Sequence, residues 1–247
     1  MKVLFLLWVS LITLHAGSIR IAVAANVSYA IPTLLQRFNQ THPDTKVQVT
    51  LGGTGKLTAQ IRHGAPYDLL MAADMGYPQA LYREGLATEK PHIYARGALA
   101  LLSTRKQDFS KGLALLLDPS IEKIAIANPK TAPYGKASFE ALSSAGLLER
   151  LKPKFVYGES ISQTVAHTVN AADIGFVAKS SLYSPQMSAY REGREWMAVD
   201  PAQYKAIDQG MVILTAAAGN PEVRAWVDFM LSPAAREILQ RYGYTLP

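Results

Sequence analysis

Residues 19–29 read IRIAVAANVSY: an apolar, β-branched run ends in a loop of small and hydroxylated residues, after which a helix begins. The same order recurs at residues 47–56, 123–136 and 154–164. The first N–H groups of a helix lack intrahelical partners, and the helix macrodipole gives them partial positive charge. Four such helix starts that meet at one point would bind an anion, and this convergence is our central hypothesis.

The N-terminal part of the chain alternates strands and helices. We predict strands at residues 18–25, 45–51 and 68–73, with a helix after each of the first two. This βαβαβ order is typical of a parallel sheet that helices cover on both faces. The same rhythm returns in the second half of the chain, where we predict strands at residues 98–102, 124–127, 155–157 and 174–177.

This rhythm predicts an α/β fold of two lobes. We expect residues 17–96 and 215–247 to form lobe I and residues 97–214 to form lobe II. The crossings between the lobes are expected at residues 94–97 and 215–219, where small or turn-forming residues flank a strand. Open α/β sheets bind ligands at the carboxyl ends of their strands, so the cleft between the lobes is the expected binding site.

The N-terminus has the composition of an export signal. Residues 3–14 form an apolar run after Lys2, and small residues follow. This run is shorter than the ~20 residues that span a bilayer, so we predict a signal peptide at residues 1–16, cleaved after Ala16. An uncleaved anchor or core helix is the alternative, because Leu14 is a poor substitute for the small residue expected at that position. A cleaved signal implies an exported protein.

Composition narrows the class of protein further. The chain has 247 residues, 49% of them hydrophobic and 18% charged, which is enough for a packed core. It has no cysteine, which excludes disulfides and thiolate metal sites. The net charge of +6 comes from scattered cations, so nucleic acid is not an expected partner, and a mild positive field favours a small anion. We expect a monomer with no cofactor and no cation site.

The first two loops offer several hydrogen-bond donors. The loop Asn26-Val27-Ser28 carries an amide, a hydroxyl and free backbone N–H groups. The loop at residues 52–56 has three glycines, which let the main chain approach a ligand closely, together with the hydroxyl of Thr54. Gly55 and Lys56 follow at the helix start. A tight turn between strand and helix is the alternative explanation for these glycines.

The third and fourth loops lie in the second half of the chain. The loop at residues 128–135 contains two prolines, which lower the entropy cost of ordering it. Tyr134 stands at the helix opening, where its hydroxyl or its backbone N–H could meet a ligand; packing on the cleft wall is the alternative. The loop at residues 158–163 places Ile161 and Ser162 at the start of the next helix.

Several stretches carry a family resemblance in combination. They are Asn26-Val27-Ser28, residues 52–61 (GGTGKLTAQI), residues 64–74 (GAPYDLLMAAD), residues 128–135, residues 174–177 and the terminal Arg241-Tyr242-Gly243-Tyr244. From about residue 19 to residue 247 the chain resembles the periplasmic molybdate-binding proteins of ABC transporters. The GAPYDL stretch and the Arg-Tyr-Gly ending are specific together, whereas each glycine loop alone is not.

The resemblance implies a type II periplasmic binding fold, in which two α/β lobes close on a tetrahedral oxyanion. It implies anion contacts from Asn26, Thr54, Tyr134 and the backbone N–H of Ile161, and delivery of molybdate or the similar tungstate to a membrane permease. Some members have Ser in place of Asn26, and some use a Tyr hydroxyl where this chain has Ala178, a loss that Tyr134 can offset. The predicted oxyanion ligands are Asn26, Val27, Thr54, Tyr134 and Ile161, with Ser28, Gly55, Lys56 and Ser162 as further candidates.

Alternative functions come from different classes. The sequence has neither a Gly-x-Ser-x-Gly elbow nor a His-Glu-x-x-His pair, so we predict no enzyme. A regulatory ligand-sensing domain would need a helix-turn-helix, which we do not find. Sulfate or another small oxyanion remains an alternative cargo on the same scaffold. A fully ionised dianion only accepts hydrogen bonds and therefore suits these donor-rich loops, whereas phosphate carries a proton near neutral pH and would need an acceptor.

Overall fold

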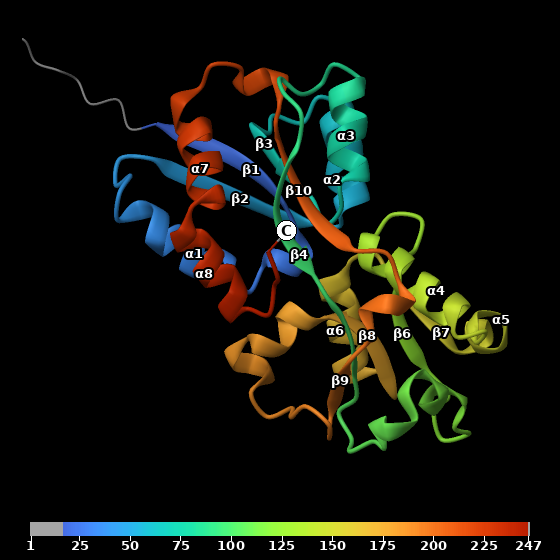
Figure 1. The fold of residues 1–247 in the computed structure, drawn as a ribbon. Coiled ribbons are helices and arrows are strands. Elements are labelled where there is room, and N and C mark those ends of the chain that lie inside the picture. Colours follow the sequence, from blue (N-terminus) through green and yellow to red (C-terminus); the bar gives the residue numbers. More distant parts are fainter. Residues whose placement is uncertain (1–16, 247) are drawn as a thin grey trace, which may run out of the picture.

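The computed structural model describes residues 17–246, which form two α/β lobes joined by two chain crossings (Figure 1). Each lobe contains its own five-stranded sheet, which confirms the predicted two-lobe α/β class. The predicted signal peptide, residues 1–16, lies outside the described residues. None of the helices within residues 17–246 has the length and apolar character needed to cross a membrane.

The sheet of lobe I has the strand order β2-β1-β3-β10-β4. Strands β1, β2 and β3 are parallel, and β10 is antiparallel to both of its neighbours. The strands are β1 (Ser18–Ala24), β2 (Lys46–Gly52), β3 (Leu69–Met71), β4 (His92–Gly97) and β10 (Ile207–Ile213). The helical segments are η1 (Ala25–Val27), α1 (Ile31–Asn39), α2 (Thr54–Arg62), α3 (Gly76–Arg83), η7 (Thr215–Ala217), α7 (Pro221–Leu231) and α8 (Pro233–Arg241).

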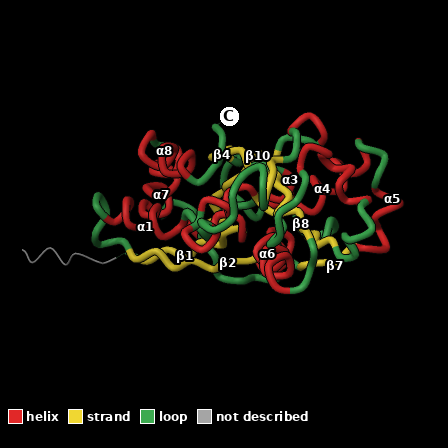
Figure 2. Tube along the Cα trace, turned by 90° about the horizontal axis from the view of Figure 1, so that it is seen from below, coloured by secondary structure: helices red, strands yellow, loops and turns green. Residues whose placement is uncertain are grey.

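Helices cover both faces of this sheet because successive residues of a strand point to opposite faces. Ile21 packs in the cluster under α1, α7 and α8, where the rings of Phe38 and Trp226 meet edge to face with centroids 5.0 Å apart. Figure 2 shows these three helices on one side of β1 and β2. Ala22, the next residue along β1, joins the opposite cluster with Leu57 of α2.

The sheet of lobe II has the strand order β7-β6-β8-β5-β9. The strands are β5 (Leu99–Leu102), β6 (Ile124–Ala127), β7 (Phe155–Gly158), β8 (Ile174–Ala178) and β9 (Trp196–Ala198). The α-helices are α4 (Pro133–Ser144), α5 (Leu148–Leu151) and α6 (Ile161–Asn170). Leu99 and Leu101 share a cluster with α4, whereas Ala100 and Leu102 share one with Val165 of α6.

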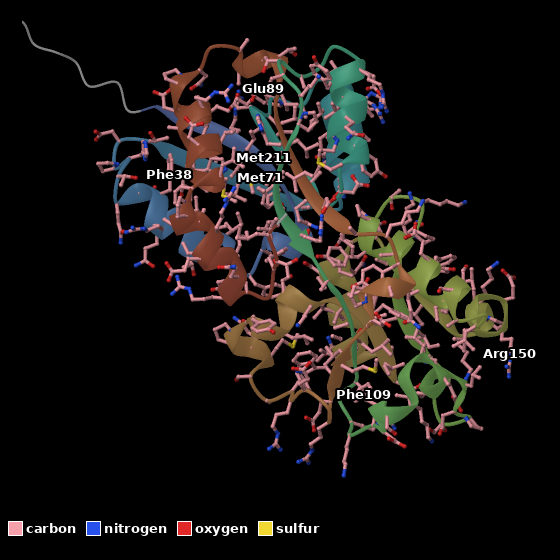
Figure 3. All side chains as sticks on the ribbon, viewed as in Figure 1. Phe38, Met71, Glu89, Phe109, Arg150 and Met211 are labelled. Carbon is pink, nitrogen blue, oxygen red and sulfur yellow. The ribbon has the colours of Figure 1, made fainter. Side chains whose placement is uncertain are left out.

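One expected boundary is wrong. Residues 97–214 were expected in lobe II, but β10 (Ile207–Ile213) lies in the sheet of lobe I, between β3 and β4. Met211 pairs with Met71, and both are fully buried in the core of that lobe, where Figure 3 labels them. The chain therefore returns to lobe I before β10 and not at residues 215–219. An antiparallel strand inserted from far along the chain carries no local signal of the sheet that receives it.

Candidate functional site

A small cavity lies where the two lobes meet. Its lining includes the starts of four helical segments, namely η1 and α2 of lobe I and α4 and α6 of lobe II, together with the ends of strands of lobe I. The lining residues are Ala24, Ala25, Asn26, Gly52, Gly53, Thr54, Ala73, Ala132, Pro133, Tyr134 and Ile161. None of these side chains is charged. Three of the predicted helix starts, those of α2, α4 and α6, therefore meet at one cavity, and the fourth place is taken by the 3-10 turn η1, which precedes α1.

The first helix start is held by Asn26, whose side chain is 1% exposed. Its Nδ2 donates to Oε1 of Gln209 at 2.7 Å and to the hydroxyl of Tyr244 at 2.9 Å. Its backbone carbonyl accepts hydrogen bonds from the Tyr244 hydroxyl at 2.9 Å and from the Ser180 hydroxyl at 3.0 Å. These bonds fix the loop from both lobes and from the C-terminal segment.

The second helix start has Thr54 as its first residue. The Thr54 Oγ1 accepts a hydrogen bond from the Ala73 N–H at 3.1 Å, so the hydroxyl proton remains free for another acceptor. Gly53 and Gly55 flank it because the other lobe comes very close. A Cβ on Gly53 would lie 2.9 Å from the carbonyl oxygen of Glu159, and one on Gly55 would lie 2.8 Å from that of Thr131.

The third helix start combines Pro133 and Tyr134. Proline has no backbone N–H, but at the first helical position that N–H would have no intrahelical partner in any case. The N–H of Tyr134 also lies in the first turn of α4, without an intrahelical partner. The Tyr134 side chain is buried, and its hydroxyl lies beside the Asn26 side-chain amide but makes no hydrogen bond of good geometry with the described residues. Burial, followed by the neighbouring Tyr244 and Tyr94, raises the pKa of Tyr134 well above its usual value. The phenol is therefore neutral and keeps a proton to donate.

The fourth helix start places Ile161 after the N-cap residue Ser160. The Ser160 side chain accepts a hydrogen bond from the Gln163 N–H, which leaves the Ile161 N–H free of the cap. At the neighbouring position, the Ser162 hydroxyl crosses the cleft and donates to the carbonyl oxygen of Ala25 at 2.9 Å. The backbone of Ile161 is thus available to the cavity, whereas the Ser162 hydroxyl joins the lobes.

Direct hydrogen bonds between the lobes surround the cavity. They include Ser162 Oγ to Ala25 O at 2.9 Å, Ser180 Oγ to Asn26 O at 3.0 Å and Gly55 N to Thr131 O at 3.0 Å. The apolar cluster of lobe II also includes Ala24, Ala25 and Ala73 of lobe I. The lobes are therefore in contact, and the structure represents a closed arrangement.

Comparison with known sequences decides the family. Residues 19–245 match the family described as bacterial extracellular solute-binding protein. The chain belongs to this family. It is 37% identical to the molybdate-binding protein ModA of Azotobacter vinelandii, over 94% of this chain and 91% of that protein. It is also 37% identical to ModA of Rhodobacter capsulatus, over 93% of this chain and 88% of that protein.

Solved structures agree with this membership. The periplasmic molybdate-binding protein of Azotobacter vinelandii superimposes with a TM-score of 0.86 at 29% identity, covering 93% of this chain and 99% of that one. The sulfate-binding protein SubI of Mycobacterium tuberculosis gives a TM-score of 0.76 at 14% identity, covering 92% of this chain and 86% of that one. The second likeness shows the shared fold alone.

The predicted ligands of this solute-binding protein divide into two groups. Asn26, Thr54, Tyr134 and Ile161 line the cavity. Val27, predicted with them, is fully buried and turns its side chain into the core of lobe I, so that only its backbone remains to contact an anion.

The further candidates lie outside the cavity lining. Gly55 and Lys56 line a larger groove beside it, and the Gly55 N–H already donates to Thr131. The Ser162 hydroxyl is bound to Ala25, and Ser28 is absent from the cavity lining. These differences arise because a helix start turns only its first N–H groups toward one point, while the next residues point elsewhere.

Sequence reasoning missed the residues that support Asn26. Gln209 is fully buried on β10, and Ser180 and Tyr244 come from segments far away in the sequence. One signal was available: Gln209 is a polar residue beside the apolar run at residues 211–214. A buried polar side chain needs a hydrogen-bond partner, but the sequence does not reveal which one.

Proposed function

We propose that this solute-binding protein captures molybdate, and also tungstate, in the periplasm and delivers it to the membrane permease of an ABC transporter. The observation that carries this proposal is the convergence of four helix starts on a cavity lined by uncharged residues. A dianion without protons only accepts hydrogen bonds, so a site of N–H and O–H donors stabilises it without a basic side chain.

The proposed donors come from both lobes. Lobe I supplies the Thr54 hydroxyl and the backbone at Asn26 and Val27, and lobe II supplies the backbone N–H groups of Tyr134 and Ile161. Hydrogen bonds to a charged partner contribute roughly 1.5–3 kcal/mol each. Because the donors are divided between the lobes, a bound anion would stabilise the closed arrangement.

The relatives support molybdate as the cargo. The two ModA proteins that are 37% identical to this chain are named as molybdate-binding proteins. Tungstate is included because its size and charge closely match those of molybdate. We further propose that the chain acts as a monomer, without a cofactor and without catalysing a reaction. Sulfate, the cargo named for a protein of the same fold, is the rival that the binding experiment must exclude.

Isothermal titration of the mature chain with molybdate, tungstate, sulfate and phosphate tests the proposal. We expect a one-to-one complex with molybdate and with tungstate in the absence of metal cations. A thermal unfolding scan provides an independent measurement, because a ligand that binds only the native state raises the melting temperature. If sulfate or phosphate gives the larger increase at equal concentration, the assigned cargo is wrong.

A further inference from the structure

The side-chain amide of Asn26 has one orientation that satisfies its neighbours. Gln209 Nε2 donates to the backbone carbonyl of Ile207 at 2.9 Å and faces that of Ala73 at 3.4 Å. Backbone carbonyls only accept, so this nitrogen must face them and Oε1 must face Asn26. The Asn26 group that meets Oε1 at 2.7 Å is therefore its Nδ2.

Tyr244 independently requires the same orientation. Its hydroxyl has one proton, which it donates to the backbone carbonyl of Asn26 at 2.9 Å. At its second contact, 2.9 Å from the Asn26 side chain, this hydroxyl must accept, and the partner must again be Nδ2. Both protons of the Asn26 amide are thus used, and its Oδ1 is left without a partner among the described residues.

The network lies where β10 and β4 connect the lobes. The register of β10 against β4 shifts between Gln209 and Gly210, an irregularity of the kind that re-aims a side chain. On β4, a Cβ added to Gly97 would lie 3.0 Å from Gln209 Nε2 and would overlap the hydroxyl of Tyr134. Gln209 and Tyr134 therefore pack against the same glycine at the first crossing.

We propose that Gln209 and Tyr244 are positioning residues of the oxyanion site, an inference that rests on the proposed function. They turn the Asn26 amide nitrogen toward themselves, hold η1 in place before the anion arrives, and leave to the anion the backbone N–H groups of this loop. Neither residue lines the cavity, so both act through Asn26. Preorganisation of this kind lowers the cost of ordering the loop when the ligand binds.

A double-mutant cycle on molybdate affinity tests this role. Gln209→Leu removes the acceptor for Nδ2, and we expect molybdate to bind about tenfold more weakly, as for loss of one buried hydrogen bond. In a chain that already carries Asn26→Ala, the same change should have an effect below about twofold, because the two residues act through one contact. Asp208→Asn, a neighbouring change at a partly exposed ion pair with Arg96, should leave the affinity unchanged.

Each outcome of the cycle decides the proposal. A tenfold loss in both backgrounds would show that Gln209 acts elsewhere and would overturn it, as would an unchanged affinity in Gln209→Leu alone. If Gln209→Leu does not fold, Tyr244→Phe takes its place in the same cycle with the same expected result. If the unchanged chain binds no oxyanion, the proposed function is overturned as well. If it binds molybdate but the effects of the two substitutions simply add, only the positioning role is overturned.

Discussion

Thr54 serves the fold and the candidate site with a single hydroxyl. Its oxygen accepts the Ala73 N–H, which ties α2 to the segment after β3, and its proton remains for the cavity. Tyr134 is the complementary case, because its buried hydroxyl lacks a partner among the described residues. A buried polar group of this kind costs free energy unless a hydrogen-bond partner satisfies it.

We expect Thr54→Val to weaken molybdate binding roughly five- to a hundredfold, because it deletes a donor to the anion while keeping the shape of the side chain. Isothermal titration measures the change. Thr58→Val is the matched control, since Thr58 lies on the same helix and its buried hydroxyl donates to the Thr54 carbonyl at 2.9 Å, away from the cavity. An equal loss of affinity in both variants would contradict a direct contact from Thr54.

Tyrosine ionisation should limit stability at alkaline pH. Burial raises the pKa of Tyr134 well above its ordinary value, and the same holds for Tyr94. The unfolded chain therefore loses these protons first, so the contribution of these tyrosines to the free energy of unfolding should be constant below about pH 10 and should fall as the pH rises further. Denaturant unfolding at a series of pH values should show a shallower fall in Tyr134→Phe. If the variant shows an identical pH dependence, ionisation of Tyr134 does not contribute to the loss of stability at alkaline pH.

At the scale of elements, glycine decides how closely α2 approaches lobe II. The Gly55 N–H donates to the Thr131 carbonyl at 3.0 Å, and this contact leaves no room for a side chain. Gly53 meets the carbonyl of Glu159 in the same way. Helix starts on opposite lobes can reach one cavity because Gly53 and Gly55 carry no Cβ at this contact between the lobes.

Gly55→Ala should hold the lobes apart. Its Cβ would lie 2.8 Å from the Thr131 carbonyl oxygen and 2.9 Å from the Tyr77 hydroxyl, and backbone cannot yield as a flexible side chain does. We expect weaker molybdate binding and a larger radius of gyration by small-angle scattering. Gly76→Ala is the control, because its Cβ would make only ordinary contacts, the nearest at 3.6 Å. If the Gly55→Ala chain is as compact as the unchanged chain, the contact between Gly55 and Thr131 does not require the absence of a side chain.

At the scale of the whole molecule, the charged side chains lie outside the lining of the cavity. The net charge is +6, yet the residues that line the cavity are uncharged. Lys56 lines the groove on one side of the cavity, and Lys130 lines a second groove. A strongly hydrated ammonium is costly to bury, so cations placed at the mouth can attract an anion without entering the site.

Lys56→Gln should therefore lower the association rate of molybdate at low ionic strength and leave the dissociation rate unchanged. Steering by an exposed charge fades as salt screens it, so the difference in association rate should disappear at high salt. Stopped-flow measurement of both rates at two salt concentrations checks this. A large rise in the dissociation rate that salt does not reduce would show that Lys56 contacts the anion directly.

The sequence by itself determined the helix starts. Glycine, proline and small hydroxylated residues after apolar runs act locally, so they predicted that Tyr134 and Ile161 open helices, that a helix follows the loop containing Thr54, and that the lobes have α/β folds. The apolar run at residues 19–25 likewise predicted a buried strand. Such features depend on neighbours within a few residues, which is why they can be read without coordinates.

Tertiary structure alone decided the rest. The place of β10 in the sheet of lobe I, and with it the return crossing, depends on pairing with strands more than a hundred residues away. The support of Asn26 by Gln209 and Tyr244 spans 183 and 218 residues. Hydrogen bonds and packing act over a few ångströms in space, whatever the separation along the chain. Local sequence patterns therefore predicted where donors arise, and only the fold decided which of them face one cavity.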